Sequence, residues 1–129
     1  MLRGFLLLLV FLAGCATPAY KMQESDLVWE EKVIQAPYQV VYNRILSSFR
    51  GDEYARAEGF MYSDNKEAII DIYLRNDGPF NLSPWTIGII KLTAISDIET
   101  NVRAGVNEGN LYFSGKGHLR QEWLKAAGE

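Results

Sequence analysis

The chain has 129 residues, of which 48% are hydrophobic and 22% are charged. These are the values of an ordinary globular protein, and the length fits one small domain with accessory segments. Lys and Arg number 13 and Asp and Glu 16, which gives a formal charge of −3. Because the basic residues are scattered singly along a mildly acidic chain, nucleic acid and anionic lipid surfaces are excluded as default partners.

The amino-terminal residues have the organisation of an export signal. Arg3 supplies a positive charge, and Phe5 to Ala13 form an unbroken apolar run of nine residues. A membrane-spanning helix needs about 20 apolar residues, whereas the apolar part of a signal peptide has roughly 7–15. The sequence therefore predicts a signal peptide over residues 1–14.

Leu12-Ala13-Gly14-Cys15 resembles the lipobox of bacterial lipoproteins at all four positions. The resemblance implies cleavage between Gly14 and Cys15, diacylglycerol on the Cys15 sulfur, and a further acyl chain such as palmitate on the new amino group. Each buried methylene contributes about 0.8 kcal/mol, so two or three chains anchor a protein stably. The alternative is an ordinary secretory signal with a chance cysteine, which would leave an unpaired thiol in an oxidising compartment.

The residues after the cysteine indicate where the protein is held. In Gram-negative lipoproteins an Asp directly after the cysteine commonly signals inner-membrane retention, and here Ala16 and Thr17 follow. The resemblance therefore implies lipid anchoring to the outer membrane, on its periplasmic face. Residues 15–26 show no periodicity, and we interpret them as the lipidated cysteine and a flexible tether. About ten flexible residues have an r.m.s. span of roughly 17 Å, so the domain, residues 27–129, should work close to the bilayer.

The folded part begins with a predicted strand and a predicted helix. Residues 27–35 are rich in β-formers, and Pro37 suits the first turn of a helix. Gly51 is a natural helix stop. Between them one apolar stripe with helical spacing is formed by Tyr38, Val41, Tyr42, Ile45 and Phe49.

Several strands and a closing helix follow. Strands are predicted over residues 54–63, 67–75, 85–95 and 100–106, a short one over 111–113, and a helix over 118–127. Alternation in the second of these strands puts one face on Ala68, Ile70, Ile72 and Leu74. In the third, we expect Ile87 and Ile89 on one face and Ile90 and Leu92 on the other.

This order predicts an α+β fold: an antiparallel sheet of about five strands, with a helix after the first strand and a short carboxy-terminal helix covering one face. The segments Val33–Val41 and Lys91–Val106 are similar to the opening and the central hairpin of helix-grip domains. Usual members of that family have more strands and a longer last helix, which enclose a ligand cavity.

No motif for catalysis or metal binding is found. The single cysteine excludes an intramolecular disulfide and a Cys-rich metal site. With the single histidine, His118, a zinc site would have only carboxylates as further ligands. Glu30 and Glu31 are neighbours on a strand, so they point to opposite faces and cannot share a proton. His118 is expected at the surface, at the start of the last helix. We therefore expect a protein that is not an enzyme and has no cofactor.

One loop is a candidate interaction site. Phe80, Leu82 and Trp85 form an apolar patch among turn residues, which can mark a contact with a partner or a membrane. The alternative is that this loop folds back on the core. For Trp29 and Trp123, packing in the core is the expected role.

Two functions are therefore carried forward. The first is a membrane-anchored lipoprotein whose non-catalytic periplasmic domain binds another cell-envelope protein, in an assembly or structural role. Helix-grip modules also occur in lipoproteins of outer-membrane assembly machinery. The second is a carrier of a small hydrophobic ligand or lipid, as the helix-grip resemblance implies. An enzyme acting on cell-wall or lipid substrates is a third and weaker candidate.

Overall fold

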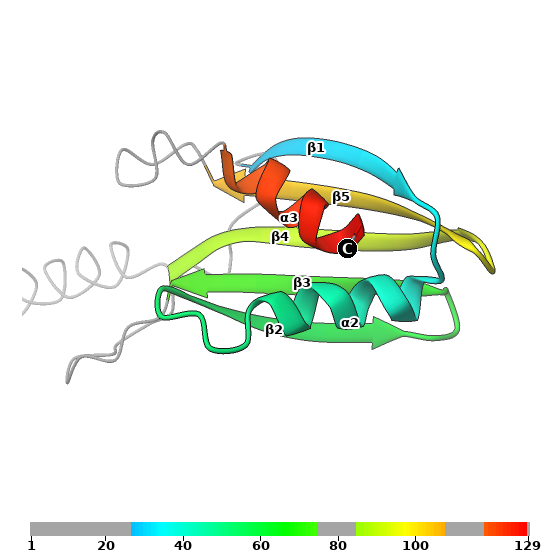
Figure 1. Ribbon diagram of the computed structural model, residues 1–129, viewed down its shortest axis with the longest axis horizontal. Helices are drawn as coiled ribbons and strands as arrows, with labels where there is room; N and C mark the ends of the chain where they lie inside the picture. The colour runs from blue at the N-terminus through cyan, green and yellow to red at the C-terminus, as the bar shows by residue number, and fades with distance from the viewer. Residues whose placement is uncertain (1–26, 75–84, 108–117, 129) are drawn as a thin grey trace, which may run out of the picture.

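The computed structural model describes residues 27–74, 85–107 and 118–128 (Figure 1). Each described strand and the last helix begin and end within one residue of the predicted position, whereas the first helix ends at Ser48, before the predicted stop at Gly51. The predicted strand over residues 111–113 lies outside the described residues. In chain order the elements are β1 (Leu27–Ile34), α2 (Tyr38–Ser48), β2 (Ala55–Tyr62), β3 (Glu67–Leu74), β4 (Trp85–Ser96), β5 (Glu99–Asn107) and α3 (His118–Gly128).

The strands form one antiparallel sheet with the order β1-β5-β4-β3-β2. Strands β2 to β5 follow one another as a meander, and β1 joins at the far side of β5. Both helices lie on the same face of this sheet, with α3 over β1 and β5 and α2 nearer β2 to β4 (Figure 1). The predicted α+β fold is confirmed.

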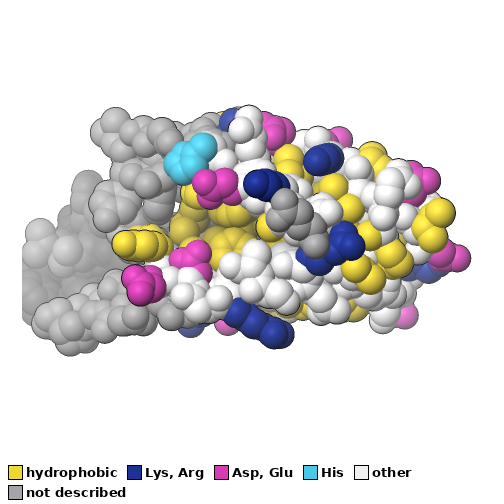
Figure 2. Space-filling model, viewed as in Figure 1, with side chains coloured by type: hydrophobic (Ala, Val, Ile, Leu, Met, Phe, Trp, Pro, Cys, Tyr) yellow, Lys and Arg dark blue, Asp and Glu magenta, His cyan; other side chains and the backbone are white. Residues whose placement is uncertain are grey.

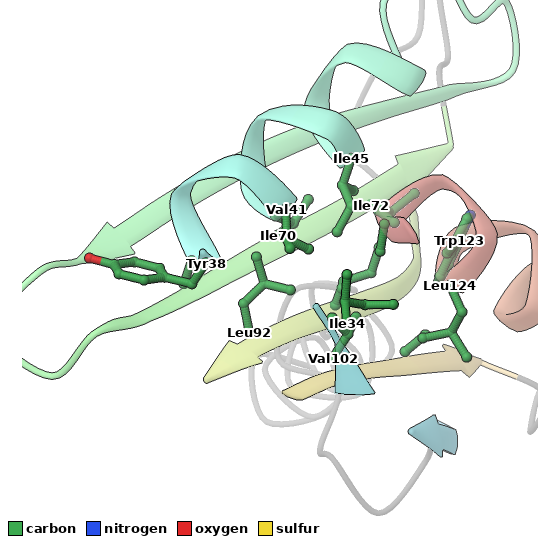
Figure 3. Packing of buried hydrophobic residues seen from close by; sticks show 14 of the residues in the cluster. Ile34, Tyr38, Val41, Ile45, Ile70, Ile72, Leu92, Val102, Trp123 and Leu124 are labelled. Atoms are coloured by element: carbon green, nitrogen blue, oxygen red, sulfur yellow. The ribbon is translucent and has the colours of Figure 1, made fainter. Parts of the chain in front are cut away.

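The core lies between the helices and this face of the sheet (Figure 3). Alternation along each strand sends every second residue toward the helices, and these residues are the fully buried ones. From the helix layer, α2 contributes Val41 and Ile45 to the core, and α3 contributes Trp123 and Leu124. The strands contribute mainly Ile70, Ile72, Ile90, Leu92, Val102, Ala104 and Val106.

A buried hydrogen bond joins the first helix to the sheet. The hydroxyl of Thr100, which is fully buried in β5, donates to the backbone carbonyl of Ala36 at 2.8 Å. Ala36 stands directly before Pro37, the N-cap residue of α2. This bond satisfies a buried carbonyl at the point where the chain turns from β1 into the helix.

A β-bulge in β4 corrects one sequence prediction. Ile72 pairs with Gly88 but Tyr73 pairs with Thr86, so Ile87 is an extra residue in β4. A bulge turns the local side chains out of strict alternation. Ile87 is consequently buried in the core with Ile90 and Leu92, and the prediction that it shares a face with Ile89 is wrong.

Several chain segments leave the sheet at one end, which we call the tether end. There β1 begins at Leu27 opposite Asn107, the last residue of β5, and β3 ends at Leu74 opposite Trp85, the first residue of β4. The start of β1, from which the chain leads back toward Cys15, therefore lies at this end, together with the end of β3, the start of β4 and the end of β5 (Figure 1). The opposite end, which we call the far end, carries the β4–β5 hairpin with Ile98.

Candidate functional site

A hollow lies at the tether end, between the end of α2 and the beginning of α3. Its volume is about 480 Å³, and it is partly open. Figure 2 shows it as an apolar depression with acidic side chains at its rim. The residues that line it are Ser48, Phe49, Asp52, Tyr54, Ala55, Leu74, Ile87, Leu119, Glu122, Trp123 and Ala126.

The floor of the hollow is built by aromatic and aliphatic side chains from five elements or their ends, namely α2, β2, β3, β4 and α3. Phe49 and Trp123 meet edge to face, with ring centroids 6.3 Å apart. Such a pair is favourable because the positive edge of one ring meets the negative face of the other. Ile87 reaches this floor because of the β4 bulge, which turns it toward the helices.

One wall of the hollow is the turn between α2 and β2. Gly51 ends the helix region with a φ of +77°, a backbone conformation that side chains with a Cβ rarely adopt. Asp52 follows, and one of its carboxylate oxygens accepts hydrogen bonds from the backbone amides of Tyr54, at 2.8 Å, and Ala55, at 3.0 Å. This turn therefore holds the Asp52 carboxylate beside the hollow and presents Tyr54, which is 76% exposed.

The charge at the hollow is one-sided. Among the described residues, the charged side chains that line it are Asp52 and Glu122, and none of the described lining residues is Lys or Arg. Within the described part of the chain, neither carboxylate makes an ion pair with a basic side chain. The hollow thus combines an apolar floor with an acidic rim, which suits an apolar group that carries or adjoins a cation.

A second cluster lies on the open face of the sheet, away from the helices. Trp29 is half-buried there and packs over Gly105, so the expectation that it belongs to the core is wrong. The Arg103 guanidinium lies 4.6 Å and the Lys91 ammonium 5.7 Å from the centroid of a Trp29 ring. Burial, and then the charge of Arg103, lower the pKa of Lys91 below its ordinary value. Trp123, by contrast, is buried as predicted.

Tyr73 and Asp71 lie on the same open face. The Tyr73 hydroxyl donates to the Asp71 carboxylate at 3.2 Å. Burial raises the pKa of Tyr73 to about 12, and the nearby Asp71 charge adds to this effect. Burial also raises the pKa of Asp71, partly offset by the bond from Tyr73. The bond between them stabilises the protonated form of Tyr73 and the ionised form of Asp71. Both groups lie away from the hollow.

The residues singled out from the sequence fall in several places. Glu30 pairs with Arg120 of α3 at 3.7 Å, while Glu31 pairs with Arg103 on the open face at 2.9 Å, which confirms that the two carboxylates point to opposite faces. His118 is exposed at the first position of α3, as predicted.

Of the predicted lipidation site and interaction loop, the structure describes only the residue at the end of the loop, Trp85. Gly14, Cys15, Phe80 and Leu82 lie outside the described residues. Trp85 begins β4 and pairs with Leu74 through the backbone, which places the start of this strand beside the hollow. The loop prediction thus points to the same end of the domain as the hollow.

Sequence reasoning did not find the hollow itself. Asp52 and Glu122 come from a turn and a helix that are far apart in the sequence, and Ile87 depends on a bulge. Within residues 27–74, 85–107 and 118–128, no group of three His, Cys, Asp or Glu side chains is placed to hold a metal ion. No helix among those residues has the length and apolar character needed to cross a membrane.

Comparison of the chain with protein-family models, with curated proteins and with solved structures finds no match in any of the three.

Proposed function

We propose that the chain is a membrane-anchored lipoprotein whose non-catalytic periplasmic domain binds another cell-envelope protein. In this proposal the signal is cut before Cys15, lipid on Cys15 anchors the protein to the outer membrane, and the domain works at the bilayer surface. The observation that supports it is the coincidence of the open hollow with the tether end. The chain leads from Leu27, at that end, back toward Cys15.

The reach of the tether makes this coincidence useful. Residues 15–26 have a maximum length of about 40 Å at roughly 3.5 Å per residue. A hollow at the end from which the tether leaves is therefore kept within reach of proteins that lie in or on the same membrane. Tethering in this way raises the effective concentration of a weak site for such partners.

Anchoring is tested first by cell fractionation of the wild-type protein and the variant Cys15→Ser. We expect the wild-type protein in the membrane fraction, with a mass increase from acyl chains, and the variant without lipid and uncut by the lipoprotein signal peptidase. Wild-type protein that lacks acyl chains on Cys15 would contradict the anchoring step.

Binding is tested by photo-crosslinking in cells. A photo-reactive amino acid at Tyr54, which lines the hollow, should give a discrete adduct with another envelope protein. The matched control is Ile98, which is 67% exposed at the far end of the domain. If Tyr54 gives no protein adduct, or gives only what Ile98 gives, the proposed binding site is wrong.

The second candidate function, a carrier of a small hydrophobic ligand or lipid, is favoured by the size of the hollow. Its volume of about 480 Å³ falls within the range of about 300–1,000 Å³ of small-molecule sites. Against it stands the filled core between helices and sheet, since the hollow occupies only the tether end. Native mass spectrometry of detergent-free protein decides between them, because a carrier should retain a stoichiometric mass of lipid size.

A further inference from the structure

We infer that the hollow receives a short segment of a partner protein in which an apolar side chain stands next to Lys or Arg. This inference rests on the proposed function and adds the chemistry of the partner. The apolar side chain would occupy the floor formed by Phe49, Ile87 and Trp123. The cation would meet the carboxylates of Asp52 and Glu122 at the rim.

The floor accounts for the apolar half of this segment. Its aromatic and aliphatic groups are held by the sheet and by both helices, so the surface exists before anything binds. A preformed apolar surface avoids the cost of ordering flexible groups on association. Because the hollow is partly open, it can receive part of a polypeptide chain that continues beyond it. An enclosed cavity could hold only a separate small molecule.

The rim accounts for the cationic half. Asp52 lies in the turn before β2 and Glu122 in α3, beside the same apolar surface, and none of the described residues that line it is basic. An apolar surface next to two negative charges that make no ion pair within the described residues attracts a cation carried by an apolar group and repels an anionic one. Fatty acids and anionic phospholipids carry negative head groups, so the charge favours a basic peptide segment over these lipids.

The position of the two carboxylates makes Glu122 the better one to change. The Asp52 carboxylate holds the turn through the amides of Tyr54 and Ala55, so replacing it would disturb the wall of the hollow. Glu122 is exposed on α3 and makes no hydrogen bond or ion pair with another described residue. Its replacement should therefore leave the fold unchanged.

The test uses two labelled peptides, blocked at both ends, and the mature chain from residue 15 with Cys15→Ser. One peptide reads Gly-Lys-Trp-Leu-Lys-Gly, and the other has Glu in place of both Lys residues. Fluorescence anisotropy should show saturable binding of the Lys peptide that is at least about tenfold tighter than that of the Glu peptide. Glu122→Lys should weaken the Lys peptide about tenfold, whereas Glu67→Lys, an exposed change at the far end of β3, should leave its affinity unchanged.

The outcomes separate this inference from the function on which it rests. Equal affinity for the two peptides, or affinity unaffected by Glu122→Lys, overturns the inference. If Tyr54 still crosslinks to an envelope protein in the Glu122→Lys background with undiminished yield, the inference falls while the proposed function stands. If Tyr54 crosslinks to lipid alone, both fall and the carrier function takes their place.

Discussion

Trp29 and Trp123 pack against opposite faces of the sheet, and each lies over a glycine of an interior strand. Trp123 covers Gly88 on the helix side, and Trp29 covers Gly105 on the open side. The two glycines are neighbours across the β4–β5 pair, since Gly88 is opposite Val106 and Gly105 is opposite Ile89. The sheet therefore carries no side chain at either position, and an indole ring takes the space on each face.

Replacing these glycines should destabilise the fold to different degrees. A Cβ at position 88 would lie 2.8 Å from the Trp123 ring and would also meet the backbone carbonyl of Gly105. Because neither can move easily, we expect Gly88→Ala to lower the free energy of unfolding by about 1–3 kcal/mol. Gly105→Ala should cost less, since the half-buried Trp29 can shift toward solvent. Urea unfolding curves measure both, and an equal or larger cost for Gly105→Ala would contradict this account.

The bond from Thr100 to Ala36 should contribute measurably to stability. Thr100→Val keeps the shape of the side chain but leaves the buried Ala36 carbonyl without this donor. The expected cost is about 1–3 kcal/mol of unfolding free energy. Thr100→Ser is the matched control, because it keeps the hydroxyl and loses only a methyl group. A Val variant as stable as the wild-type protein would show that another group satisfies this carbonyl.

Gly51 should resist substitution although it has free space around it. A Cβ at this position meets nothing within 4 Å, but the φ of +77° is unfavourable for residues with a Cβ. We expect Gly51→Ala to cost about 1–2 kcal/mol of unfolding free energy, and Gly51→Asn to cost less, because Asn tolerates this conformation. Thermal unfolding of the two variants tests the order, which would be reversed if steric contact rather than backbone conformation decided it.

The Tyr73–Asp71 pair predicts a distinctive alkaline titration. The pKa of Tyr73 is raised from 10.0 to about 12, so the folded protein holds this phenolic proton more tightly than the unfolded chain. The stability from this group is fully present below pH 10 and is lost as the pH rises through about 12. Ultraviolet difference titration should show a late tyrosine ionisation that Tyr73→Phe removes.

Asp71→Asn serves as the control for the cause of this shift. The Asp71 charge raises the pKa of Tyr73, so removing the charge should move the late ionisation toward lower pH while burial still keeps it above 10. If the late ionisation is unchanged by Asp71→Asn, burial alone sets the pKa of Tyr73.

Most of the fold follows from periodicity in the sequence, whereas the hollow does not. The stripe from Tyr38 to Phe49 and the alternation from Ala68 to Leu74 each report a local repeat of buried positions, and both were predicted from spacing alone. Ile87 was assigned to the wrong face because a bulge adds one residue to β4. The bulge is defined by the pairing of β4 with β3, which the sequence of β4 alone does not reveal.

The tryptophans show the same division between local and non-local information. Tryptophan is a residue type expected in the core, and both Trp29 and Trp123 were assigned to it. Trp29 nevertheless lies on the open face, because the register of β1 against β5 places it opposite Gly105. In the same way, Asp52 and Glu122 meet only when the last helix is laid over the sheet. No spacing within one segment encodes either arrangement.

The strand order also limits when β1 can pair during folding. Of the described strands, β1 is synthesised first, but the strand with which it pairs is β5, with Leu27 opposite Asn107 and Ile34 opposite Thr100. Pairing of such distant segments is slow because a long loop must close first. Because the chain is synthesised from its amino end, β1 cannot complete its edge of the sheet until β5 has been synthesised.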